Sequence, residues 1–326
     1  MIISGMLPPS IHCTAALAAA SVQPPTGALR LADWGVIRAR GDDARSFLHA
    51  QLTSDIKQLD AGAARLAGYC SPKGRLLATF VVWPGDAGEV LLACSADLLE
   101  PTLKRLTMYV LRARCRLDDA SAEFPLWGLA GAQAMAAVDA PGTPWRHVGR
   151  AGGSAIALPP ARVADTGVPR ALFVGAAAPA LPALAADAWC WLEVLSGVPR
   201  IVAATVERFV PQTVNLELVG GVDFQKGCYP GQEVVARSQY RGTLKRRGCL
   251  LAGAVPFAPA QELFDTADPG QPAGTVALAG SYAGLHVALA ELKIAAQRGA
   301  DLHLGSADGP PIETLAPPYP IPLEGA

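Results

Sequence analysis

One short segment of the chain gathers most of its reactive groups. QKGCYPGQEVVARSQYRG, residues 225–242, holds a single thiol, Cys228, inside a tight turn. Gly227 and Gly231 allow a positive φ or a close backbone approach, and the proline between them fixes a further φ. Lys226 adds a positive charge and favours the thiolate, the form of cysteine that attacks electrophiles and binds metals. The segment predicts a rigid turn that presents a functional thiol; a cysteine packed as a small hydrophobe is the alternative.

Polar and basic residues follow the thiol. Gln232 and Glu233 carry hydrogen-bonding groups suited to a polar heterocycle or to a neighbouring loop. A run of cations comes next, in a chain whose net charge is only -1: Arg237, Arg241, Lys245, Arg246 and Arg247. Because Arg binds carboxylates through paired hydrogen bonds, the run predicts a strip for an acidic ligand. A solvated surface is the alternative interpretation.

The rest of the sequence offers no second catalytic constellation. It contains no GxGxxG after a predicted strand, no GxxxxGK[ST], no HExxH and no GxSxG, and its five histidines are scattered. The seven cysteines are odd in number and none is spaced as CxxC. This spacing argues against a disulfide framework, a zinc site or a cluster ligated by this chain alone, and it fits a reducing cytoplasm.

The elements that must position the turn form a mixed pattern without regular β-α alternation. Apolar spacing marks strands at 31–41 and in a hairpin at 75–95, and helices at 42–56, 96–112 and 185–197. Gly197 stands where a left-handed residue commonly ends a helix. Short apolar runs after Gly242, separated by Gly and Pro, predict a small β-barrel or sandwich.

Length and composition allow two or three domains. The chain has 326 residues, 51% of them hydrophobic and 17% charged, which is enough for a substantial core. Residues 1–26 contain no Lys or Arg, so we interpret them as a disordered leader and not as a secretory signal. No apolar run is long enough to span a membrane. We expect no membrane association and, given the near-zero net charge, no direct nucleic-acid binding.

The motifs together resemble a known family. KGCYPGQEVVAR followed by RG and KRR, with the stretch from Phe209 to Glu233, looks like the signature of the YgfZ family. These are folate-binding proteins related to the aminomethyltransferase of the glycine cleavage system. GDDARSFLHAQLTSDI and YCSPKGRLLATFVV resemble the two other recurring blocks of the family. The similarity extends from about Leu31 to Leu251.

The resemblance implies an α+β fold, a multidomain ring around a central folate cavity with a small C-terminal β-barrel. We expect the leader at 1–26, a discontinuous folate-binding domain at 27–115 and 186–243, a middle α+β domain at 116–185, and the barrel and tail at 244–326. The family also implies tetrahydrofolate or a folate derivative as cofactor. It further implies a cytoplasmic role in assembling or repairing iron–sulfur enzymes, including cluster-dependent tRNA modification, with those enzymes or cluster-assembly proteins as partners.

The same resemblance suggests which residues serve the ligand. Eight are expected near the pterin or the acidic tail of folate: Asn215, Lys226, Tyr229, Gln232, Glu233, Arg237, Arg241 and Arg246. Cys228 is expected at the rim of the cavity, acting in thiol exchange or transiently coordinating iron or a cluster together with a partner's ligands. No resident metal is expected, because one thiol cannot hold a cluster alone.

Two positions depart from the aminomethyltransferases. Where those enzymes carry an acidic pair that includes the catalytic aspartate, this chain has Ala78 and Thr79. Leu195 aligns with a folate-contacting glutamate of the relatives, although Glu193 is close by. Because Ala78 and Thr79 provide no carboxylate for general acid–base catalysis, we expect an accessory protein and no aminomethyl transfer. A folate-dependent one-carbon (aminomethyl-type) transferase is the alternative, and an RNA-binding module built on the basic run is a third.

Two further features have structural interpretations. Asp55, in LTSD, is expected at a helix C-terminus or turn. Trp189 and Trp191 are expected to pack in the core of helix 185–197 and not to form a stacking platform for a ligand.

Overall fold

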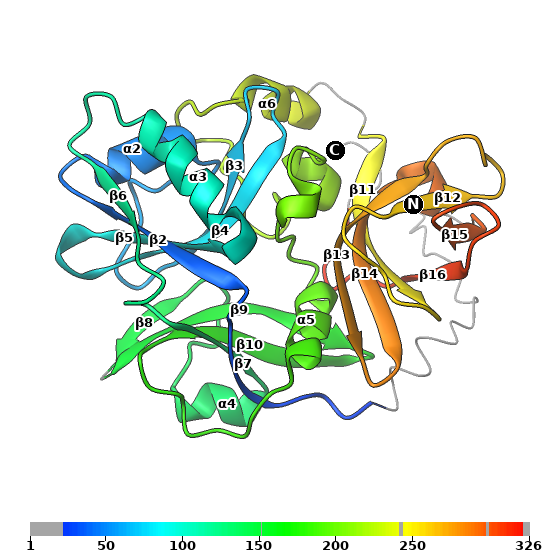
Figure 1. The fold of residues 1–326 in the computed structure, drawn as a ribbon, viewed down its shortest axis with the longest axis horizontal. Coiled ribbons are helices and arrows are strands. Elements are labelled where there is room, and N and C mark those ends of the chain that lie inside the picture. The colour runs from blue at the N-terminus through cyan, green and yellow to red at the C-terminus, as the bar shows by residue number, and fades with distance from the viewer. Residues whose placement is uncertain (1–21, 151, 241–243, 298–299, 322–326) are drawn as a thin grey trace, which may run out of the picture.

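The structure, a computed structural model, describes residues 22–150, 152–240, 244–297 and 300–321. Three bodies surround one centre (Figure 1): a five-stranded sheet with two helices at the upper left, a second five-stranded sheet below it, and a closed barrel at the right. This architecture confirms the predicted α+β fold with a C-terminal barrel. Arg241 and residues 1–21 of the expected leader lie outside the described residues.

The first sheet is antiparallel, with the order β3-β4-β5-β2-β6. Its strands are β2 (Trp34–Arg40), β3 (Arg65–Cys70), β4 (Leu76–Pro84), β5 (Val90–Ser95) and β6 (Arg116–Asp119), and its helices are α2 (Ala44–Gln51) and α3 (Ala96–Met108). Successive strand residues point to opposite faces. Val82 and Leu92 pack with the helices, whereas Val81 and Leu91 pack toward the second sheet. Both faces are therefore buried, which explains why the hairpin is apolar without clear alternation.

The second sheet has the order β1-β7-β10-β9-β8. Its elements are β1 (Gly27–Arg30), β7 (Leu126–Ala130), helix α4 (Ala132–Ala137), β8 (His147–Arg150), β9 (Gly153–Val163) and β10 (Thr166–Val174). Two strands fall on the other side of the expected boundaries. β1 pairs with β7 and so joins the middle body, while β6 pairs with β2 and so belongs to the first sheet. Each pairing covers a strand edge that would otherwise expose unpaired backbone groups.

The barrel closes through the order β11-β14-β13-β12-β15-β16. Its strands are β11 (Arg246–Gly253), β12 (Glu262–Asp265), β13 (Gly274–Tyr282), β14 (Leu285–Lys293), β15 (Leu302–Leu304) and β16 (Pro311–Leu315). Helix α5 (Ala186–Leu195) packs on it at Gly280, where a Cβ would lie 2.7 Å from the backbone of Trp191. Gly197, with φ of 66°, follows α5 in the left-handed conformation, as predicted.

An irregular segment connects α5 to the barrel and contains helix α6 (Gln232–Tyr240), which lies at the top of Figure 1. The short 3-10 helices are η1 (Asp86–Gly88), η2 (Ala203–Thr205), η3 (Pro211–Val214) and η4 (Ile294–Gln297). Within the described ranges, none of the helices combines the length and the apolar character needed to cross a bilayer.

Candidate functional site

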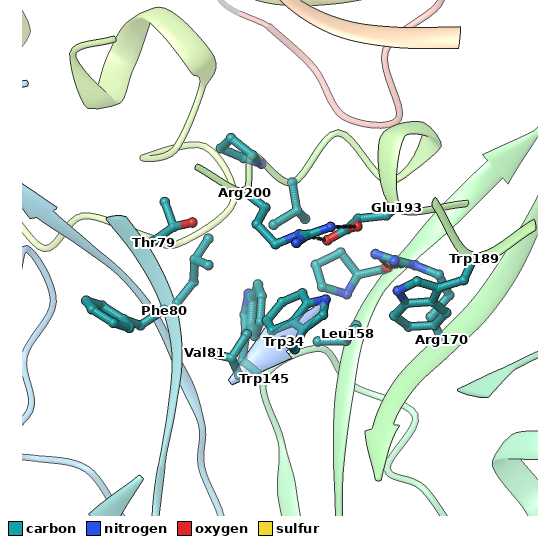
Figure 2. Close-up of a pocket in the computed structure, with 14 residues that line it drawn as sticks. Trp34, Thr79, Phe80, Val81, Trp145, Leu158, Arg170, Trp189, Glu193 and Arg200 are labelled. Carbon is teal, nitrogen blue, oxygen red and sulfur yellow. Dashed lines mark hydrogen bonds and ion pairs between the residues drawn. The ribbon is translucent and has the colours of Figure 1, made fainter. Parts of the chain in front are cut away.

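The two sheets and helix α5 meet at a narrow cavity, shown in Figure 2. Its polar and aromatic lining comes from segments far apart in the sequence: Trp34, Thr79, Phe80, Trp145, Arg170, Trp189, Glu193 and Arg200. The space left between the side chains is about 30 Å³, enough for about one or two water molecules. A larger ligand therefore enters only when side chains of the wall move.

Arg200 is the centre of a closed ion-pair network in this cavity. Its guanidinium donates to both carboxylate oxygens of Glu193, at 2.8 and 2.9 Å, and to Asp33 at 2.9 Å. It also lies over the ring of Trp34, 5.0 Å from the centroid. Although burial opposes its charge, the carboxylates raise the pKa of Arg200 above its ordinary value. The Glu193 carboxylate is consequently committed to a buried partner.

Arg170 is a second buried guanidinium with a different environment. It is 3% exposed, and its Nε and Nη2 both donate to the carbonyl of Pro159, at 3.3 and 3.1 Å. Its guanidinium carbon lies 5.3 Å from the ring centre of Trp189. Within the described ranges no carboxylate forms a direct ion pair with it, and burial lowers its pKa to about 10, although the nearby charge of Glu193 opposes this shift. A buried charge that no carboxylate contacts directly is costly, so this group is suited to meet an anionic or acceptor-rich ligand.

The aromatic walls add unpaired donors. The indole Nε1 atoms of Trp34 and Trp189 are buried and find no acceptor among the described residues. Trp145 differs, because its Nε1 donates to the carbonyl of Val219 at 3.0 Å. Buried indole N–H groups usually have a partner. The two free donors therefore favour a flat ligand that carries hydrogen-bond acceptors.

The residues of the thiol turn serve a different place. Lys226 is 8% exposed, and its Nζ donates to the carbonyl of His49 and, at 2.7 Å, to that of Leu52. It also lies over the buried ring of Tyr229, 4.8 Å from the centroid. Burial lowers the pKa of Lys226 to about 8. Lys226 thus caps the C-terminal end of α2 and anchors the turn, while Cys228 itself is exposed.

Comparison with known proteins adds to this geometry. No protein-family model matches the chain. The tRNA-modifying protein YgfZ of Photobacterium profundum is 34% identical to it over 259 residues, which covers 75% of each chain. The chain belongs to the YgfZ family. The protein of the same name from Edwardsiella ictaluri is also 34% identical over 259 residues, covering 73% of this chain and 77% of the relative.

A solved structure shows which fold the chain shares. The aminomethyltransferase T of the glycine cleavage system from Bartonella henselae superposes with a TM-score of 0.71 at 15% identity. The superposition covers 93% of this chain and 89% of the transferase. The likeness confirms the predicted relation between YgfZ and the aminomethyltransferase fold.

Several residues that the sequence singled out as ligand-binding candidates stabilise the fold instead. Asn215, 1% exposed and left-handed with φ of 61°, exchanges two hydrogen bonds with the backbone of Gly248, at 2.9 and 3.1 Å. Asn215 thereby fastens the segment after η3 to the first barrel strand. Arg247, from the basic run, forms a buried ion pair with Glu217 in the same region.

The remaining candidates are spread over α6 and β11. Glu233 and Arg237 form an exposed ion pair at 2.7 Å on α6, where Gln232 is half-buried. Arg246, on β11, pairs with Glu291 at 3.2 Å. Most of the basic run thus has acidic partners within the protein, which weakens the interpretation of a cationic strip for a ligand. None of the described candidates is among the residues that line the central cavity.

The residues that line the cavity were not predicted from the sequence, although the sequence contains a weak indication of one of them. Arg170 stands within the apolar strand GVPRALFV, and a charged residue is almost never buried in this way without a partner. Trp189, which we expected to be core, is buried and also lines the cavity. Leu195 packs in the apolar core, whereas Glu193 lines the cavity, because residues two apart point to different sides of a helix. Thr79 does line the wall, and its hydroxyl accepts the N–H of Ile201 at 3.0 Å.

Proposed function

We propose that the central cavity binds tetrahydrofolate or a closely related folate. We further propose that the chain is an accessory protein for iron–sulfur enzymes, including those that modify tRNA. The observation that carries the ligand proposal is Arg170, a buried guanidinium in the cavity wall that forms no ion pair with a carboxylate of the described residues. A pterin supplies the hydrogen-bond acceptors that the donors of this wall lack, and it is flat and able to stack against indoles.

The wall also supports binding without aminomethyl transfer. Among the described residues that line it, Glu193 is the sole carboxylate, and both of its oxygens are bound by Arg200. Thr79 has no titratable group to act as a general base. The role in tRNA modification is supported by the names of the curated relatives. The role in cluster assembly or repair is supported by the family resemblance of the thiol motif.

Anaerobic titration calorimetry with tetrahydrofolate tests the ligand. We expect saturable binding by the wild type, and a loss of at least about tenfold in Arg170→Met, because the variant removes the charge that faces the ligand. Arg162→Met is the matched control: Arg162 lies on the neighbouring strand with a side chain that is 46% exposed, and its variant should bind as the wild type does. No saturable binding by the wild type would disprove the proposal.

A substitution of Cys228 tests ligand binding and the cellular role independently. Since Cys228 does not line the cavity, we expect Cys228→Ala to bind tetrahydrofolate normally. In cells that lack the native protein, the same variant should fail to restore a cluster-dependent tRNA modification, measured by nucleoside mass spectrometry. Full restoration by Cys228→Ala would show that the thiol has no part in the cellular function.

A further inference from the structure

A second group of reactive side chains lies away from the central cavity, at the end of α2. His49, in the last turn of the helix, places Nδ1 3.0 Å from Oδ1 of Asp55. The same carboxylate oxygen accepts the backbone N–H of Gln58 at 3.1 Å. Both side chains are mostly buried, with exposures of 12% and 14%. The imidazole is therefore held in one orientation by a carboxylate that has its own anchor.

The thiol turn is fixed against this pair. Lys226 donates to the carbonyls of His49 and Leu52, so the turn and the helix end move as one unit. Gly227 follows directly, and a Cβ built on it would lie 3.5 Å from Nε2 of His49. The second imidazole nitrogen thus faces the backbone immediately before Cys228, whose side chain is exposed.

The surroundings keep the ring neutral. Burial lowers the pKa of His49, and the positive charges of Lys226 and Lys57 lower it further, while Asp55 opposes them. A neutral imidazole carries a single N–H. With that proton on Nδ1, directed at Asp55, the other nitrogen is left as an acceptor. An acceptor that faces the turn carrying an exposed thiol is in a position to serve as its general base.

We propose that His49 is the general base for Cys228 and that Asp55 is the residue that positions it. The proton passes from Sγ to Nε2, Asp55 stabilises the resulting imidazolium, and the thiolate attacks a soft electrophile. With a disulfide of a partner protein, a new S–S bond forms to one partner sulfur, the partner's own S–S bond breaks, and its second sulfur leaves as a thiolate. No hydrogen bond joins Cys228 to His49 among the described contacts, which is common for such pairs before a reactant binds.

The pH dependence of alkylation tests this assignment on the full chain. Iodoacetamide is the probe: Sγ forms a bond to the methylene carbon and iodide leaves. The rate at Cys228 is followed by peptide mass spectrometry, with the half-buried Cys115 as an internal reference. In His49→Gln we expect the inflection of the profile to rise by about one pH unit. The rate near neutral pH should fall about threefold, since a more basic thiolate is also more nucleophilic. Asp55→Asn should show a smaller shift in the same direction.

Two further variants make the outcome decisive. His303→Gln removes a histidine of the barrel that also contacts an aspartate, Asp301 at 3.1 Å, and should leave the Cys228 profile unchanged. Gly227→Ala keeps every ionisable group and places a methyl against Nε2, so its profile should move toward that of His49→Gln. Superimposable profiles for the wild type, His49→Gln and Gly227→Ala would overturn the proposal. Because the thiol lies outside the cavity, a failed folate titration would leave this result unaffected.

Discussion

Replacing Arg170 by Met should leave the free energy of unfolding of the ligand-free protein almost unchanged, although the residue is only 3% exposed. Burial lowers the pKa of Arg170 from 12.5 to about 10, which corresponds to about 3 kcal/mol spent on keeping the charge in place. Against this stand the two N–H donors that share the Pro159 carbonyl, together worth about 2 kcal/mol as one hydrogen bond from a charged group, and the stacking on Trp189, worth about 1 kcal/mol. The terms cancel, so we expect the free energy of unfolding to change by less than about 1 kcal/mol.

Arg200→Met should behave in the opposite way. Its removal leaves the carboxylate of Glu193, 5% exposed, without its ion-pair partner. Breaking a buried ion pair from one side costs about 3–5 kcal/mol. The two substitutions are chemically identical and lie in the same cavity, so they form a matched pair that differs in the partner of the charge.

Urea unfolding followed by far-UV circular dichroism measures both variants against the wild type. The reasoning predicts coincident midpoints for the wild type and Arg170→Met, and a large loss for Arg200→Met. A loss of about 3 kcal/mol or more in Arg170→Met would refute it. In that case Arg170 would be a structural residue whose interactions are already satisfied, and the argument for an acceptor-rich ligand would lose its support.

Other substitutions test the rest of the structure. Burial lowers the pKa of Lys226 from 10.5 to about 8, so between these values the unfolded chain holds a proton that the native chain has released. The stability of the wild type relative to Lys226→Met should therefore rise across this window, by up to about 3 kcal/mol in urea titrations; a constant difference would contradict the burial argument. Gly280→Ala should lower the free energy of unfolding by about 2 kcal/mol, because the added Cβ would lie 2.7 Å from the α5 backbone. Gly270→Ala, with no atom within 4 Å, should be neutral, and equal melting temperatures for the two would contradict the clash. Asn215→Ala should lower the free energy of unfolding by about 3 kcal/mol, because it removes the two hydrogen bonds to Gly248. An unchanged melting temperature would show that these bonds do not stabilise the protein.

The fold could be predicted where the sequence signal was local. Helical spacing marked α3 and α5, two apolar runs on either side of the turn residues PGDAG marked the β4–β5 hairpin, and Gly197 marked the end of α5. The helix predicted at 42–56 is shorter, ending at Gln51, because the chain then turns to pair with β3. The placement of β1 could not be foreseen, since its partner β7 lies about a hundred residues further along.

The cavity was harder to predict than the thiol turn. Cys228 and its glycines are contiguous, so their types alone suggested a rigid turn. Arg170, Trp34 and Glu193 become neighbours only when two sheets and a helix assemble, and no spacing rule connects them. Lys226 shows the same limit, because its partners, His49 and Leu52, lie at the end of α2, more than 170 residues earlier.

The first sheet also determines how the chain can be divided. Val81 and Val82 are adjacent, yet they belong to different apolar cores, one shared with the second sheet and the barrel and one shared with α2 and α3. A fragment cut at the boundary between the bodies would leave one face of this sheet in water, including Trp83 and Leu91. The chain should therefore unfold in a single cooperative transition, and fragments of it should be insoluble when expressed alone. Tags or fused proteins belong at its ends and not between its bodies.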